Sequence, residues 1–165
     1  MQVSVQIRRL IAATLVCASL VLGVSMLIGA GHAAAGPTSQ KHTCSAADKQ
    51  FLQTVQENMT QLGYWSDSLL SGDATPALVI RQTNAESRQV GATDPTDISL
   101  LTARSLLRKM FLEYGAAVHA KALGSAPGKH VQTAYTLANG VHDLLVDAQP
   151  QMAAMGCNVT PLLGA

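Results

Sequence analysis

The chain has 165 residues, of which 48% are hydrophobic and 13% are charged, and its formal net charge is +1. This length suits a single domain. A nearly neutral charge balance gives no electrostatic footprint for nucleic acid or for an anionic membrane surface, so we expect neither as a partner.

The N-terminus has the pattern of a secretory signal peptide. Arg8 and Arg9 precede an almost wholly apolar run over 10–29, and small residues follow up to Ala35. We therefore expect 1–35 to be removed near Ala35 and the protein to be secreted or placed in the periplasm or cell envelope. The Ala-rich, Lys-poor signal is typical of bacteria. Two alternatives stay open: the apolar run could remain as a membrane anchor, or Arg8-Arg9 could belong to a twin-arginine signal.

Two of the three cysteines lie outside the predicted signal, at the edges of the remaining chain. Removal of 1–35 would leave nine Lys and Arg against ten acids, a net charge of −1. In an oxidising compartment such a pair favours a disulfide between Cys44 and Cys157. A crosslink around a loop of roughly 114 residues would contribute at most about 4.7 kcal/mol to stability. We expect a folded domain over 36–157 and a flexible tail over 158–165.

The first two predicted helices differ in character. The first covers 46–70, begins with the capping-box-like pair Ser45 and Asp48, and ends at Gly72. The second covers 76–90, with Thr75 as its cap and Pro76 at its first position. From 81 to 89 its one apolar residue is Ala85, so we expect this helix to lie loosely on the surface. The alternative is that its polar residues face a wet groove that admits a ligand.

Two further helices follow. The third lies between Asp97 and Gly124, and the fourth begins after Gly128 and is expected to kink or end at Pro150, with one more turn over 151–155. Apolar side chains recur at spacings of three and four in three of the four helices, which predicts core-facing stripes. The stripes are Phe51, Leu52, Val55, Met59, Leu62, Trp65 and Leu69; Leu100, Ala103, Leu107, Met110, Phe111, Tyr114, Ala117 and Val118; and Val131, Ala134, Tyr135, Leu137, Ala138, Val141, Leu144, Leu145 and Ala148.

These elements predict an all-α protein, an up-down four-helix bundle closed by one terminal disulfide and preceded by a signal peptide. Short connections favour antiparallel neighbours. An even number of such helices places both chain ends at the same end of the bundle. Cys44 and Cys157 would then be neighbours, in agreement with the disulfide expected from their count.

The sequence carries none of the common motifs for catalysis or metal binding. The chain has no Glu-x-x-His pair of the di-iron bundles, no G-x-S-x-G elbow and no glycine-rich phosphate loop. With both cysteines in a disulfide, a zinc site that uses them is not expected. We therefore expect no metal, no cofactor and no enzymatic activity.

Four residues are candidates for ligand binding. Tyr114 and Tyr135 lie on the apolar stripes of the third and fourth helices, and His142 shares a face with Tyr135. Tyr64, beside Trp65, is the fourth candidate. For each of them the alternative is ordinary packing, with the polar group near the surface.

The segment from Cys44 to Asp48, with Tyr64 twenty residues after the cysteine, resembles the start of the secreted haem-carrier domains of mycobacteria. The resemblance covers about 25 residues and implies haem as a ligand to test. That family would carry a histidine four residues after the tyrosine, where this chain has Ser68, and its second cysteine is much nearer to the first. No haem ligand is therefore carried over.

Together these features favour an exported, non-catalytic helical protein that binds a partner macromolecule, either a protein or another component of the envelope. The alternative is a carrier of a small apolar or haem-like ligand inside the bundle.

Overall fold

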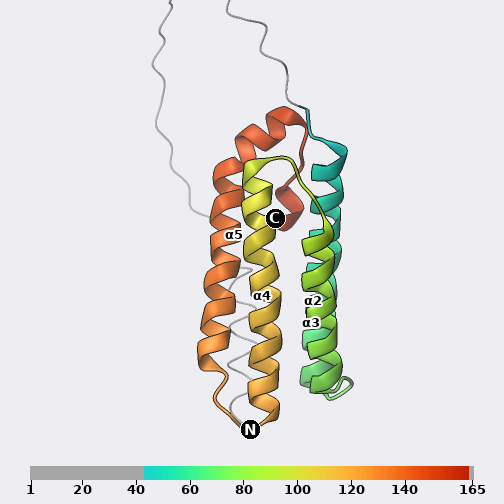
Figure 1. Cartoon of the computed structure of the whole chain (residues 1–165), viewed down its shortest axis with the longest axis vertical. Coiled ribbons are helices and arrows are strands. Elements are labelled where there is room, and N and C mark those ends of the chain that lie inside the picture. The colour runs from blue at the N-terminus through green and yellow to red at the C-terminus, as the bar shows by residue number, and fades with distance from the viewer. Residues whose placement is uncertain (1–42, 164–165) are drawn as a thin grey trace, which may run out of the picture. The chain divides into compact units, whose positions relative to one another are not determined.

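The computed structural model describes residues 43–163, and the predicted signal peptide over 1–35 lies outside this range. The described residues form four α-helices and no strand: α2 (Ala46–Ser71), α3 (Pro76–Ala92), α4 (Ile98–Ala122) and α5 (Gly128–Met155). A short 3-10 helix, η1 (Thr160–Leu162), follows. The helices lie side by side along one long axis (Figure 1). The predicted all-α class is confirmed.

Local hydrogen bonds set the helix boundaries close to the predicted positions. Ser45 and Asp48 form the predicted capping box at the start of α2, and Gly72 ends that helix in the left-handed conformation. The hydroxyl of Thr75 accepts from Leu78 N at the start of α3, where Pro76 is the first helical residue. These caps depend on neighbours in the sequence, which is why the sequence predicted them.

Helix α5 continues through Pro150 as far as Met155. The helix therefore does not end at the proline, and a kink at Pro150 stays a prediction. Figure 1 shows that α5 bends near its C-terminal end. Pro150 is exposed, so the carbonyl that loses its N–H partner can be hydrated.

The interior is divided into two apolar clusters. The larger is built mainly on α2, α4 and α5 and contains Phe51, Leu52, Val55, Val90, Leu100, Ala103, Leu107, Met110, Phe111, Val141, Leu145, Ala148, Met152, Cys157 and Val159. The smaller joins α3 to α4 through Val79 and Val118, with Trp65 and Tyr114 packed against it. Most of the predicted stripe residues on α2 and α4 lie in or against these clusters.

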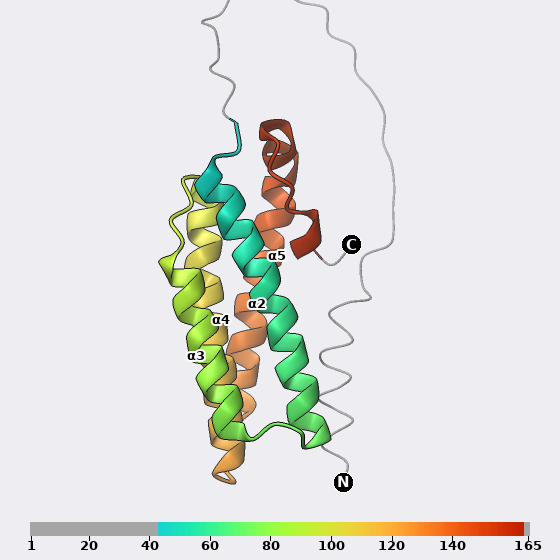
Figure 2. The same cartoon turned by 90° about the vertical axis from the view of Figure 1, so that its right-hand side faces the viewer.

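Three residues predicted for the core, Met59, Val131 and Tyr135, are exposed instead. The helix pairs in close contact are α2 with α3, α3 with α4, and α4 with α5, whereas α2 and α5 make little direct contact. Figure 2 shows α2 crossing the other helices obliquely. Because no helix covers that flank of α5 closely, an apolar stripe of the predicted width is only partly buried.

Cys44, just before α2, and Cys157, just after α5, form a disulfide with their Cα atoms 5.1 Å apart. The amide of Cys44 also donates to Met155 O at 2.8 Å. The segment after Cys157, expected to be a tail, brings Val159 into the core and η1 against α2. Nothing in its sequence pattern indicated this contact.

None of the helices within 43–163 combines the length and the apolar character needed to cross a bilayer.

Candidate functional site

The inner face of α3 is polar over two turns. Thr83, Glu86 and Ser87 are each at most 3% exposed, and Val79 and Val90 flank them on the same face. The expectation that this helix lies loosely on the surface is wrong. The polar residues of its inner face are buried against α2 and α4, while Arg81, Arg88 and Gln89 on its outer side are exposed.

Small side chains allow α3 and α4 to approach closely. A Cβ added to Gly115 of α4 would lie 2.7 Å from Thr83 Oγ1. Nearby, Ser87 Oγ donates to the backbone carbonyl of Arg108 at 3.1 Å. A larger residue at position 115 would separate the helices, so this pattern explains how a polar helix packs so tightly.

Six polar residues from three helices form what we call the polar layer. They are Asn58 and Ser66 on α2, Thr83, Glu86 and Ser87 on α3, and Tyr114 on α4.

Most polar groups in this layer have partners. Asn58 Nδ2 donates to the backbone carbonyl of Glu86 at 3.3 Å. Ser66 Oγ donates to Leu62 O at 2.7 Å and lies 2.6 Å from Tyr114 Oη. Because the serine proton is used by Leu62, the tyrosine is the donor to the serine. Such satisfied groups can be buried at little cost.

Glu86 is the exception in the polar layer. Both of its carboxylate oxygens are buried, and within the described part of the chain neither has a hydrogen-bond partner. Removal from water disfavours the charged form, and this burial raises the pKa of Glu86 to about 7. The side chain can therefore bind and release a proton near neutral pH.

The charge of Glu86 acts on the pKa of Tyr114. Burial raises the pKa of the Tyr114 hydroxyl, the hydrogen bond with Ser66 lowers it, and the charges of Glu86 and Asp67 raise it further. A neutral phenol that donates to Ser66 is the form this environment favours.

The structure does not bring the four residues predicted to bind a ligand together in one site, although Tyr135 and His142 share a flank of α5. Tyr114 is half-buried in the polar layer, while Tyr64, Tyr135 and His142 are exposed. The ring of Tyr64 packs edge-on against Trp65, and His142 Nδ1 lies 3.4 Å from Asp143 Oδ1. A role of these residues in ligand binding stays a prediction.

The composition of α3 does not distinguish Glu86 from the other polar residues of this helix, so it is not predicted as a site residue from the sequence. The residues Val79, Thr83, Glu86 and Val90 recur at spacings of four, three and four, which places them on one helical face. A face with valines at both ends and a carboxyl between them is a signal for a buried acid.

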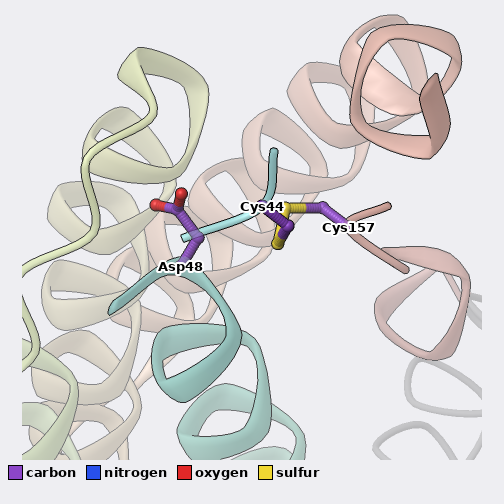
Figure 3. A group of neighbouring side chains, drawn as sticks. All are labelled: Cys44, Asp48 and Cys157. Carbon is purple, nitrogen blue, oxygen red and sulfur yellow. A yellow bond between two sulfur atoms is a disulfide. The ribbon is translucent and has the colours of Figure 1, made fainter. Parts of the chain in front are cut away.

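A second cluster lies at the disulfide. The sulfurs of Cys44 and Cys157 and a carboxylate oxygen of Asp48 are within 4.8 Å of one another. Sulfurs joined in a disulfide do not act as thiolate ligands. Figure 3 shows the Asp48 carboxylate turned away from them.

The Asp48 carboxylate connects the start of α2 to the loop before α4. It accepts from the amide and hydroxyl of Ser45, from the amide of Thr96 at 2.7 Å and from that of Asp97 at 3.1 Å. Burial acts to raise the pKa of Asp48, but these hydrogen bonds outweigh it and hold the pKa below the usual value. The Asp48 carboxylate therefore has a structural role, because its oxygen lone pairs already accept hydrogen bonds and are not available to a metal ion.

Comparison of the chain with protein-family models, with curated proteins and with solved structures gave no match.

Proposed function

We propose that this protein is an exported, non-catalytic helical protein of a bacterial cell envelope or extracellular space, which acts by binding a partner macromolecule. In this proposal 1–35 is a signal peptide removed near Ala35, and 36–157 is an up-down four-helix bundle. The basic, apolar and small-residue pattern of the N-terminus supports export. The Cys44–Cys157 disulfide is compatible with an oxidising compartment.

The observation that carries partner binding is an exposed row of side chains on α5, here called the α5 strip: Val131, Tyr135, His142 and Val146. These residues recur at spacings of four and seven, so they share one flank of the helix. Tyr135 and Val146 are 41% and 42% exposed. An exposed apolar row of this kind is typical of a binding surface.

The α5 strip lies beside the buried face of α5. That face carries Val141, Leu145, Ala148 and Met152. At 100° per residue the middle of the strip is about 100° around the helix from the middle of the buried face. The strip is therefore the exposed border of the packed face.

Site-specific photo-crosslinking in the producing cell tests this proposal. A crosslinking amino acid at Tyr135 or Val146 is expected to give the same discrete adduct, because both positions lie on the α5 strip. Asp147 is exposed, one residue from Val146 and on another side of α5, and serves as the matched control. The absence of an adduct from the strip, or an equal yield from Asp147, would count against partner binding.

A second candidate function is that of a carrier for a small apolar or haem-like ligand. It is supported by the half-buried Tyr114 hydroxyl, which lies in a polar layer inside the helices. Titration with haemin tests the haem version, with Tyr114→Phe as the comparison. A Soret shift that saturates near one equivalent and is lost in the variant supports it, and the absence of such a shift rejects it. Native mass spectrometry would detect other ligands.

A further inference from the structure

The carboxyl of Glu86 has no hydrogen-bond partner among the described residues, and few polar contacts hold the part of α3 that carries it. Both carboxylate oxygens are buried without a donor. The polar contacts that join this part of α3 to its neighbours are the bond from Asn58 to Glu86 O and the bond from Ser87 to Arg108 O. Val79 and Val90 supply the fully buried apolar contacts, and the partly buried Leu78 and Ile80 add to them at the start of the helix.

No cation compensates a charge on Glu86. Among residues 43–163, no Lys, Arg or His forms a salt bridge with it. On α4 the facing titratable group is Tyr114, whose pKa the charge of Glu86 raises, and on α2 the residue in contact is the neutral Asn58, which donates to Glu86 O. Arg108 of α4 is exposed and its side chain lies by Gly91, more than a turn from Glu86. The surroundings are therefore neutral or acidic.

A carboxylate in such a place has two outcomes when it loses its proton. It stays buried as an uncompensated charge, which destabilises the packed state, or the helix that carries it moves until water reaches the charge. The second outcome requires that α3 can move while the rest of the fold holds.

The other three helices are joined without α3. The Cys44–Cys157 disulfide connects the start of α2 to the end of α5. Asp48 connects the start of α2 to the backbone of Thr96, just before α4. Contacts between α4 and α5 add a further extensive interface. Loosening of α3 therefore leaves α2, α4 and α5 connected.

We propose that Glu86 is a pH-sensitive latch for α3. With the carboxyl protonated, α3 stays packed on α2 and α4. Loss of the proton releases the middle of α3 and admits water to the polar layer. This inference stands whether or not the proposed partner binding is correct.

Hydrogen exchange of the protein with its disulfide intact tests the latch. The amides of 79–90 are compared at pH 5 and pH 8 after correction for the intrinsic exchange rate. With a pKa of about 7 in the folded state and 4.5 as the ordinary value, linkage gives a loss of protection on the order of 100-fold. At pH 8 the amides of α4 and α5 should still be better protected than those of 79–90, because α3 opens without unfolding of the other helices.

The matched variants are Glu86→Gln and Glu57→Gln. The first keeps the shape of the neutral acid and should abolish the pH-dependent loss of protection in α3. The second changes an exposed acid of α2 and should behave as the wild type does. The latch is rejected if Glu86→Gln retains the wild-type pH dependence, or if the amides of α3 at pH 8 are as well protected as those of the other three helices.

A second measurement needs no variant. The side-chain carboxyl carbon of Glu86, followed by carbon-13 NMR in the wild type, should titrate near pH 7. A midpoint near the ordinary value of 4.5 would overturn the proposal independently of how any variant folds.

Discussion

Asp48 and Glu86 are only 4% and 3% exposed, yet their pKa values shift in opposite directions. Asp48 accepts hydrogen bonds from Ser45, Thr96 and Asp97, and its charged form is favoured despite burial. Glu86 has no donor, so burial acts alone. For these two acids, the number of hydrogen-bond donors to the carboxylate decides the direction of the pKa shift, because the extent of burial is nearly the same.

The raised pKa of Glu86 has a consequence for global stability. The folded state holds this proton more tightly than the unfolded state, so stability falls as pH rises from the ordinary value of 4.5 to about 7 and is then constant. We expect Glu86→Gln to remove this loss. At pH 8 the variant should exceed the wild type in free energy of unfolding by up to about 3 kcal/mol, with little difference at pH 4.

Urea unfolding of both proteins at pH 4, 6 and 8 measures this effect. The sign is the test: a variant that is less stable than the wild type at pH 8 would mean that ionised Glu86 has a partner in the folded protein.

The lowered pKa of Asp48 gives the opposite pH dependence. Its contribution to stability is complete above the ordinary value of 3.8 and is lost as pH falls through the lowered pKa. Asp48→Asn should cost about 1–3 kcal/mol at pH 6, because charge-assisted hydrogen bonds to Ser45 and Thr96 are weakened. The difference should shrink towards pH 2.

Urea midpoints from pH 2 to pH 6 check this, with the exposed Asp147→Asn as the control. A constant difference between wild type and Asp48→Asn over this range would show that the charge of Asp48 contributes nothing.

At the scale of helices, the close approach of α3 and α4 depends on Gly115. Gly115→Ala places a Cβ 2.7 Å from Thr83 Oγ1, so one of the helices must shift. We expect a loss of about 1–3 kcal/mol in the free energy of unfolding, as is usual for an overpacked contact. Thermal and urea unfolding measure it.

Gly63→Ala is the matched control, since a Cβ at Gly63 of α2 meets nothing within 4 Å. Helix propensity alone should then stabilise the protein by up to about 1 kcal/mol. Thr83→Ala removes the hydroxyl in the way, so Gly115→Ala should become neutral or stabilising in that background. Destabilisation of equal size in both backgrounds would contradict the proposed clash.

At the scale of the whole molecule, the features that could be predicted from the sequence are those that depend on residues close together in the chain or on the number of cysteines. Ser45 with Asp48, and Thr75 with Pro76, are caps that form within one turn. The Cys44–Cys157 disulfide followed from the number of cysteines left once a signal is removed. Signal removal itself and the up-down order stay proposals.

The remainder could not be predicted because it depends on how neighbouring helices are placed. Glu86 is buried because α2 and α4 cover it, and no local pattern says which helix covers which face. Tyr135 is exposed because α2 and α5 make little contact, although its spacing fits a core stripe. Periodicity identifies a face, but only tertiary contacts decide whether that face is buried.

Loss of the disulfide affects the whole fold. Its two cysteines are 113 residues apart in the sequence, so their crosslink removes much entropy from the unfolded chain. We expect the double variant Cys44→Ser, Cys157→Ser to unfold with a free energy lower by up to about 4–5 kcal/mol. Urea unfolding with and without reductant checks this, since reductant should destabilise the wild type and leave the double variant unchanged.

The central claim is that the protein is exported and that a disulfide joins the two ends of its helical domain. The most direct test of this claim is the intact mass of the protein recovered from outside the cytoplasm. The sample is treated with a thiol-alkylating reagent before and after reduction. We expect a chain that begins near residue 36, takes up no label without reductant and takes up two labels after it. A chain in which both cysteines are labelled without reductant would contradict the account.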